Sequence, residues 1–188
     1  MKTIGVLGIQ GAIEEHVRMV QALGHEALWV KDEATLERVE GLILPGGEST
    51  SMGKQLEWFH LLSPLRRKIT EQKLPVFGTC AGMILLAKEI ENSDQLRIGA
   101  MDINVRRNAY GSQINSFVTD IDVKGIAHKV PAVFIRAPRI ECASPEVETL
   151  ASYDGHPIFV RQGHMWAASF HPELTDSADI HALFIHSI

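Results

Sequence analysis

The chain has very few cysteines: Cys80 and Cys142 are the only two among its 188 residues. Two cysteines are too few for a disulfide framework or a cysteine-rich metal site. Long apolar runs are also absent, and the amino-terminal residues do not have the pattern of a signal peptide. We therefore expect no membrane span and a reducing cytoplasmic setting, in which a free thiol persists.

Positive charge is scarce as well. The net charge is −5, and the longest basic cluster is Arg66-Arg67-Lys68. Nucleic-acid binding is therefore disfavoured. The apolar fraction of 45% and the charged fraction of 22% are ordinary for a globular protein. Because no repeat or linker divides the chain, we expect one domain over residues 1–188.

Short apolar runs alternate with helical patterns in the first half of the chain. Strands are predicted at 4–9, 27–30, 41–44 and 76–79. Helices are predicted at 12–23, 35–39, 51–62, 64–72 and directly after Cys80. This alternation indicates a largely parallel sheet covered on both faces.

The pattern changes after Gly99. Strands are predicted at 103–105, 117–123, 133–135, 158–160 and 165–170. No long helices separate them, which favours an antiparallel or mixed arrangement. A closing helix is predicted over 176–188, with Asp176 or Ser177 as its N-cap.

The most informative segment is Gly78-Thr79-Cys80-Ala81-Gly82. It has the form G-x-C-x-G, the thiol version of the nucleophile elbow, and lies where an apolar strand turns into an apolar helix. Such a turn presents the thiol at the sheet edge, and the N-terminus of the following helix favours a thiolate. The N–H of Ala81 would face a developing oxyanion. The alternative is a tight turn around a small buried cysteine, and we expect Cys142 to be such a buried thiol.

A nucleophilic cysteine needs a base and a group that orients the base. In "SFHPEL", His171 and Glu173 are two residues apart, so on an extended backbone their side chains point the same way. Pro172 favours that extended backbone. A carboxylate beside an imidazole selects its tautomer and stabilises the imidazolium. Without the cysteine elbow, a surface turn would explain this segment equally well.

The third element is "LILPGGEST", Leu42–Thr50. Its glycines offer bare backbone N–H groups, and a tetrahedral oxyanion needs two donors aimed at one point. We predict that Ala81 supplies one donor and that Gly47 or its neighbour supplies the other. Ser49, Thr50 or Ser51 would cap the following helix. A plain strand-to-helix turn is the alternative.

Together these motifs resemble the class I, or triad, glutamine amidotransferases. More narrowly, the chain resembles the glutaminase subunit of pyridoxal 5′-phosphate synthase through "VLGIQGA", "LPGGEST", "GTCAGM", "RNAYG", "FIRAP" and "SFHPELT". The resemblance extends from about Ile4 to Thr175. Ser112 departs from it, because close relatives would have an arginine after "RNAYG".

The resemblance implies a three-layer, flavodoxin-like mixed sheet with helices on both faces. It also implies that Cys80 attacks the side-chain amide of L-glutamine to release ammonia, with His171 and Glu173 completing the triad. Its implied glutamine contacts are Gly47, Glu48, Ser49, Arg107, Ile135 and Arg136. No metal or cofactor is implied. The implied partner is a (β/α)8-barrel synthase subunit, in a larger hetero-oligomer.

Alternatives remain open from the sequence. The chain could serve another synthase, such as imidazole glycerol phosphate synthase, act as a related thiol hydrolase, or be a non-catalytic subunit. We further predict a poor glutaminase that a partner switches on. The peptide before Gly47 can flip at small cost, and Gln10 would hold its productive orientation. Among nine histidines, only His171 has a predicted partner, and His181 and His186 are not spaced as a metal pair.

Overall fold

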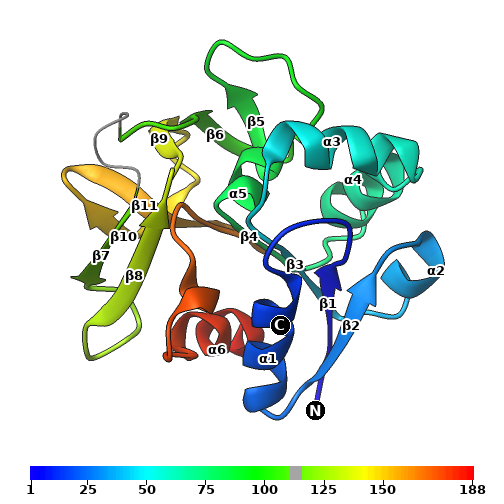
Figure 1. Cartoon of the computed structure of the whole chain (residues 1–188), viewed down its shortest axis with the longest axis horizontal. Coiled ribbons are helices and arrows are strands. Elements are labelled where there is room, and N and C mark those ends of the chain that lie inside the picture. Colours follow the sequence, from blue (N-terminus) through cyan, green and yellow to red (C-terminus); the bar gives the residue numbers. More distant parts are fainter. Residues whose placement is uncertain (111–115) are drawn as a thin grey trace.

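The computed structural model describes residues 1–110 and 116–188 (Figure 1). Ser112 lies outside the described residues. The described part contains a main sheet of seven strands: β1 (Thr3–Leu7), β2 (Glu26–Val30), β3 (Gly41–Leu44), β4 (Val76–Thr79), β10 (Glu148–Tyr153), β11 (His156–Gln162) and β12 (Met165–Ala168). Their order across the sheet is β10-β11-β12-β4-β3-β1-β2.

The main sheet is mixed, which confirms the prediction. Five neighbouring strands, from β12 through β4, β3 and β1 to β2, are parallel. Strands β10 and β11 extend the sheet in antiparallel pairings beyond β12. Strands β1, β3, β4 and β12 are almost fully buried, as expected where helices cover both faces, whereas the edge strand β2 is partly exposed.

Two smaller sheets flank the main one. One joins β5 (Ala87–Ile90), β6 (Met101–Arg106) and β9 (Arg139–Ala143), and the other pairs β7 (Ser116–Ile121) with β8 (Val130–Ile135). The sequence patterns missed β5, β9 and β10. Strands β9 and β10 lack a clean alternation of buried and exposed residues, and β5 follows a helix with no turn between them.

Helices lie on both faces of the main sheet (Figure 1). One face carries α1 (Ile13–Ala22) and α6 (Asp179–His186), whose apolar side chains share one hydrophobic cluster. The other carries α3 (Ser49–Trp58), α4 (Leu62–Thr70) and α5 (Ala81–Leu86), which pack in a second cluster together with Leu36 of the short α2 (Glu33–Leu36). This arrangement confirms the three-layer α/β fold.

Two predicted helix caps are wrong. Helix α6 begins at Asp179 with Ala178 as N-cap, because Thr175 and Ser177 bond one another and keep residues 175–178 outside the helix. Helix α3 begins at Ser49, earlier than predicted, and its N-cap is Glu48. The Glu48 carboxylate accepts hydrogen bonds from the N–H groups of Thr50 (3.1 Å) and Ser51 (2.7 Å).

The parallel strands determine where the predicted site residues meet. Cys80 follows β4, the segment to His171 follows β12, the glycine loop follows β3, and Gln10 lies just beyond β1. Carboxyl ends of parallel strands share one edge of a sheet, where ligands bind in open α/β folds. Separately, no helix in residues 1–110 or 116–188 is long and apolar enough to cross a membrane.

Candidate active site

Cys80 occupies a strained turn between β4 and α5. Its backbone angles are φ 50° and ψ −105°, a region that residues with side chains rarely adopt. Its N–H donates to the carbonyl oxygen of Ala168 at 2.8 Å, which ties the turn to the neighbouring strand β12. The side chain lies at the sheet edge, and the residue is 7% exposed. This is the geometry that a nucleophile elbow requires.

The two glycines around Cys80 are required by close packing. A Cβ on Gly78 would lie 2.5 Å from the backbone of Gly82, and a Cβ on Gly82 would lie 2.1 Å from the carbonyl oxygen of Leu44. Real Cβ atoms do not approach backbone atoms so closely. The G-x-C-x-G spacing therefore reports the tight contact between strand and helix that the turn needs.

The structure brings His171 and Glu173 together, but through a different backbone from the predicted one. Nδ1 of His171 lies 2.6 Å from Oε1 of Glu173. The His171 backbone is not helical (φ −108°, ψ 87°), whereas Pro172–Leu174 form a 3-10 helix, η1. The prediction of an extended segment through Pro172 is wrong, because the fixed φ of proline also suits the first position of a helix.

The environment of His171 favours its protonated form. Burial acts to lower its pKa, but hydrogen bonds to Cys80 and Glu173 and the negative charges of both groups outweigh burial and raise the pKa to about 10. A cysteine nucleophile needs an acid–base partner within hydrogen-bond reach that is itself oriented by a third group. His171 is bonded to both Cys80 and Glu173 and meets that requirement.

Gly46 makes room for the imidazole. A Cβ at this position would lie 2.4 Å from Cε1 of His171 and 3.0 Å from its Nδ1. The sequence interpretation treated the glycines of this loop only as sources of backbone N–H groups and missed this role. A sequence cannot reveal it, since the contact joins the ends of β3 and β12.

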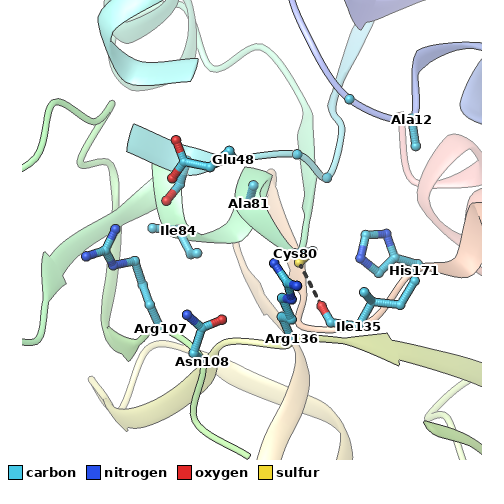
Figure 2. A pocket seen from close by; sticks show the side chains of 14 residues that line it. Ala12, Glu48, Cys80, Ala81, Ile84, Arg107, Asn108, Ile135, Arg136 and His171 are labelled. Atoms are coloured by element: carbon cyan, nitrogen blue, oxygen red, sulfur yellow. Dashed lines mark hydrogen bonds between the residues drawn. The ribbon is translucent and has the colours of Figure 1, made fainter. Parts of the chain in front are cut away.

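A cavity of about 440 Å³ contains the reactive side chains (Figure 2). Its lining includes nearly all predicted site residues: Gly47, Glu48, Ser49, Cys80, Ala81, Arg107, Ile135, Arg136 and His171. Gly11, Ala12, Gly46, Ile84 and Asn108 complete it. Two predicted residues do not line the cavity but contact residues that do: Glu173 bonds His171, and Gln10 bonds the N–H of Glu48 in the glycine loop. The volume suits a small molecule.

Arg107 and Asn108 line the side of the cavity away from His171. In the view of Figure 2, Cys80 lies between these two residues and His171. Nη1 of Arg107 donates to Oγ1 of Thr50 at 3.0 Å. Burial acts to raise the pKa of Glu48, but hydrogen bonds from Ser51 and Thr50, with a smaller contribution from the charge of Arg107, outweigh burial and lower this pKa.

Arg136 follows β8 and has a left-handed backbone conformation, with φ 44°. Its side chain lines the same cavity, next to Ile135. The carbonyl oxygen of Ile135 is 3.9 Å from the sulfur of Cys80. A strained backbone in a residue that lines a cavity is typical of a ligand-binding position.

Gln10 contacts the glycine loop directly. Its Oε1 accepts from the N–H of Glu48 at 2.9 Å, and its Nε2 donates to Oγ of Ser51 at 3.2 Å. The carbonyl oxygen of Gly46 accepts from the N–H of Ala12 at 3.2 Å. Gln10 and Ala12, in the segment that follows β1, therefore hold the orientation of the glycine loop. Gln10 is the residue predicted from the sequence to act as the switch.

Comparison with known proteins identifies the group to which the chain belongs. Residues 6–188 match the SNO glutamine amidotransferase family. The chain belongs to this family. The family resemblance predicted from the sequence motifs is thus confirmed.

Relatives of this amidotransferase match it over nearly its whole length. One from Carboxydothermus hydrogenoformans is 50% identical over 98% of this chain and 97% of its own. One from Fervidobacterium nodosum is 49% identical over 98% of this chain and 96% of its own. Both are named pyridoxal 5′-phosphate synthase subunit PdxT.

Solved structures support the same assignment. A crystal structure described as a glutamine amidotransferase has a TM-score of 0.93 and 42% identity, with 97% of each chain covered. The structure of PurLQS from Thermotoga maritima has a TM-score of 0.71 at 14% identity, covering 100% of this chain and 99% of its own. The second likeness shows the shared fold alone.

Two further histidines of the amidotransferase lie behind the triad, and the sequence interpretation missed both. His16 of α1 and His181 of α6 are fully buried, with Nδ1 of His16 2.8 Å from Nε2 of His181. A signal existed: His16 lies three residues after Ile13 and four before Val20, in the buried stripe of α1. The expectation for Cys142 was also wrong, because this residue of β9 is exposed.

Proposed function

We propose that this chain hydrolyses L-glutamine to glutamate and ammonia, and supplies the ammonia for pyridoxal 5′-phosphate synthesis. The observation that carries the proposal is the cavity that Cys80 and His171 share, with Glu173 bonded to His171. Family membership gives the substrate class, and the names of the close relatives point to vitamin B6 synthesis.

The proposed chemistry uses the three residues in sequence. Cys80 attacks the side-chain amide carbon of glutamine as the thiolate, and the imidazolium of His171 protonates the leaving nitrogen. Ammonia leaves and a thioester remains. His171 then takes a proton from water as the water attacks the thioester carbonyl, so that glutamate leaves and the Cys80 thiolate and the His171 imidazolium are restored. Glu173 stabilises the imidazolium through its bond to Nδ1.

Substrate recognition would come from the other side of the cavity. Guanidinium groups suit carboxylates, so we assign Arg107 and Arg136 to the α-carboxylate of glutamine. Gly47, Glu48, Ser49 and Ile135 line the same cavity, and we assign them to the remaining contacts. The Glu48 side chain already caps α3, which holds it in place in the absence of substrate.

The N–H groups of Gly47 and Ala81 would form the oxyanion hole, since both residues line the cavity beside Cys80. We propose that the peptide before Gly47 reorients when a synthase partner binds. The bond between the Gly46 carbonyl and Ala12 would have to break for this flip. Gln10, bonded to Glu48 and Ser51, would hold the productive orientation.

The proposed partner is a synthase subunit that consumes ammonia, with a (β/α)8-barrel fold, in a larger hetero-oligomer. Residues 1–188 would form one glutaminase domain that acts in the cytoplasm. Two alternatives stay distinct from it: service to another synthase, such as imidazole glycerol phosphate synthase, and hydrolysis of a different substrate by the same thiol.

The test is an ammonia-release assay with L-glutamine, run alone and with the pyridoxal 5′-phosphate synthase partner. We expect slow release alone and a large increase with the partner, because one missing oxyanion donor costs about 10²–10³ in rate. Gln10→Ala should reduce the increase. Full activity without a partner would refute the switch, and no release under either condition would refute the glutaminase assignment.

A further inference from the structure

The Glu173 carboxylate has one oxygen that the triad does not use. Its Oε1 bonds His171, whereas Oε2 is buried and has no hydrogen-bond partner within residues 1–110 and 116–188. A buried carboxylate is costly unless both oxygens are compensated. Close to Oε2 lies the side chain of His16, whose Nε2 is 3.6 Å away.

His16 itself sits in a short polar chain. Its Nε2 is 3.1 Å from Oγ1 of Thr79, the residue that precedes the nucleophile, and its Nδ1 is 2.8 Å from Nε2 of His181. Both rings are fully buried, and His181 packs edge-on against Phe77. Three elements, α1, α6 and β4, thus place one polar chain directly behind the triad.

Electrostatics selects one proton arrangement in this chain. If Nε2 of His16 were bare, its lone pair would face the Glu173 carboxylate in a buried site. An N–H there is favoured, and it leaves Nδ1 of His16 free to accept from Nε2–H of His181. Nδ1 of His181 is then bare, in keeping with its lack of a partner in the described structure.

We infer that His16, oriented by His181, is a positioning residue for the catalytic carboxylate. This inference rests on the proposed glutaminase function. The N–H of His16 bonds Oγ1 of Thr79, and its nitrogen lies 3.6 Å from Oε2 of Glu173, so charge attraction between this N–H and Oε2 favours the rotation of the carboxylate in which Oε1 faces His171. The ring of His171 is thereby aimed at Cys80. Partners of this kind, one step behind the reacting groups, orient catalytic side chains elsewhere too.

The two histidines suit this role because they stay neutral. Burial, and then the neighbouring His181 and His171, lower the pKa of His16 well below its ordinary value, and burial lowers the pKa of His181 to about 4. A neutral donor supports the Glu173 anion without adding a positive charge that would compete with the His171 imidazolium.

The main test compares His16→Gln with His16→Leu. Gln keeps a neutral N–H donor, whereas Leu keeps apolar bulk and removes the donor. In the ammonia assay with partner, we expect kcat to fall about 10- to 100-fold in His16→Leu with little change in KM, and His16→Gln to retain most activity. If His16 only packed, Leu would be tolerated at least as well as Gln, and that order would overturn the inference.

A second readout does not depend on glutamine. In a Cys142→Ser background, the rate of Cys80 alkylation by iodoacetamide at neutral pH should fall severalfold in His16→Leu and stay near wild type in His16→Gln. His164→Leu is the matched control, because His164 is a partly buried histidine bonded to the Ile69 carbonyl, away from the site. Wild-type protein that alkylates normally but releases no ammonia would refute the proposed function, not this inference.

A third measurement needs no variant. Nitrogen-15 NMR of the histidine rings at pH 7 should show His16 and His181 as neutral tautomers protonated at Nε2. A proton on Nδ1 of His16 would overturn the inference, even if every variant failed to fold.

Discussion

The two sides of the active-site cavity are built differently. The triad side, formed by Cys80, His171 and Glu173, is between 4% and 8% exposed and follows the central strands β4 and β12. The binding side, formed by Glu48, Arg107 and Arg136, is exposed and lies just beyond β3, β6 and β8. One side is set into the core of the molecule, and the other stands at its surface.

This difference separates chemistry from recognition. On the triad side, burial strengthens each charge interaction, so the geometry of His171 is determined before any substrate binds. On the binding side, water and salt screen the charges, and glutamine itself would complete the contacts. Changes on the triad side should therefore act on kcat, and changes on the binding side on KM.

The largest effect should come from Cys80→Ser, which should lower glutamine hydrolysis by about 10⁴-fold or more while leaving the fold intact. The swap hardly changes volume but removes the nucleophilic sulfur. Peptide mapping after reaction with a glutamine-mimicking electrophile checks the assignment. Cys142→Ser is the control. Label on Cys142 of the wild-type protein would contradict the assignment of Cys80 as the nucleophile.

His171 and Glu173 should differ in the size of their effects. His171→Gln removes the base, and the rate of glutamine hydrolysis should fall roughly 10²-fold further in this variant than in Glu173→Gln. Burial lowers the pKa of His171, and Cys80 and Glu173 together raise it to about 10, so the loss of the Glu173 charge in Glu173→Gln should lower this pKa toward its ordinary value of 6.5.

The sign of the pH effect follows from that shift. Protonated His171 stabilises the fold fully below pH 6.5 in the wild type, and this contribution is lost as pH rises toward 10. Glu173→Gln should therefore be destabilised relative to wild type near neutral pH, and the gap should narrow at high pH. Unfolding midpoints from pH 6 to pH 10 measure it, and a constant gap would contradict the assigned pairing.

Gly46→Ala would test how tightly the triad side is packed. The new methyl group would displace the His171 ring, which Glu173 holds in place, and a displacement of about 1 Å can cost roughly 10² in rate. Gly8→Ala is a suitable control, because its nearest neighbours are side-chain atoms of Lys31 and Trp29, at 3.2 Å and 3.3 Å. Equal kcat for both variants would mean that the site adapts.

The smallest effect is expected on the binding side. Arg107→Gln should raise KM for glutamine by about tenfold and leave kcat within a few-fold, since it removes a charged hydrogen bond present throughout the reaction. Arg106→Gln is the matched control, because Arg106 is paired with Glu91 and does not line the cavity. Steady-state kinetics with the partner present measures both constants. A fall in kcat without a change in KM would contradict the assignment of substrate binding to this side of the cavity.

Much of the fold and the candidate site followed from local patterns. Apolar strands, the crowded turn around Cys80 and the short distance from His171 to Glu173 are all encoded within a few neighbouring residues. Parallel strands then bring their ends to one edge, so the meeting of Cys80, His171 and the glycine loop could be inferred as well. Strands β9 and β10 could not be predicted. Strand β9 pairs with β6, which is distant in the chain, and the pairing of β10 with the adjacent β11 contains register shifts that disturb its alternating pattern.

The remaining features depend on contacts between distant segments. His16 and His181 are 165 residues apart and meet only because α1 and α6 cover the same face of the sheet. Gly46 matters because His171 arrives beside it from another strand. A sequence pattern records which residues a segment would bury. Only the packed structure decides which polar groups are buried together, and it is this proximity, through burial and charge, that shifts the pKa values of His16, His171 and His181.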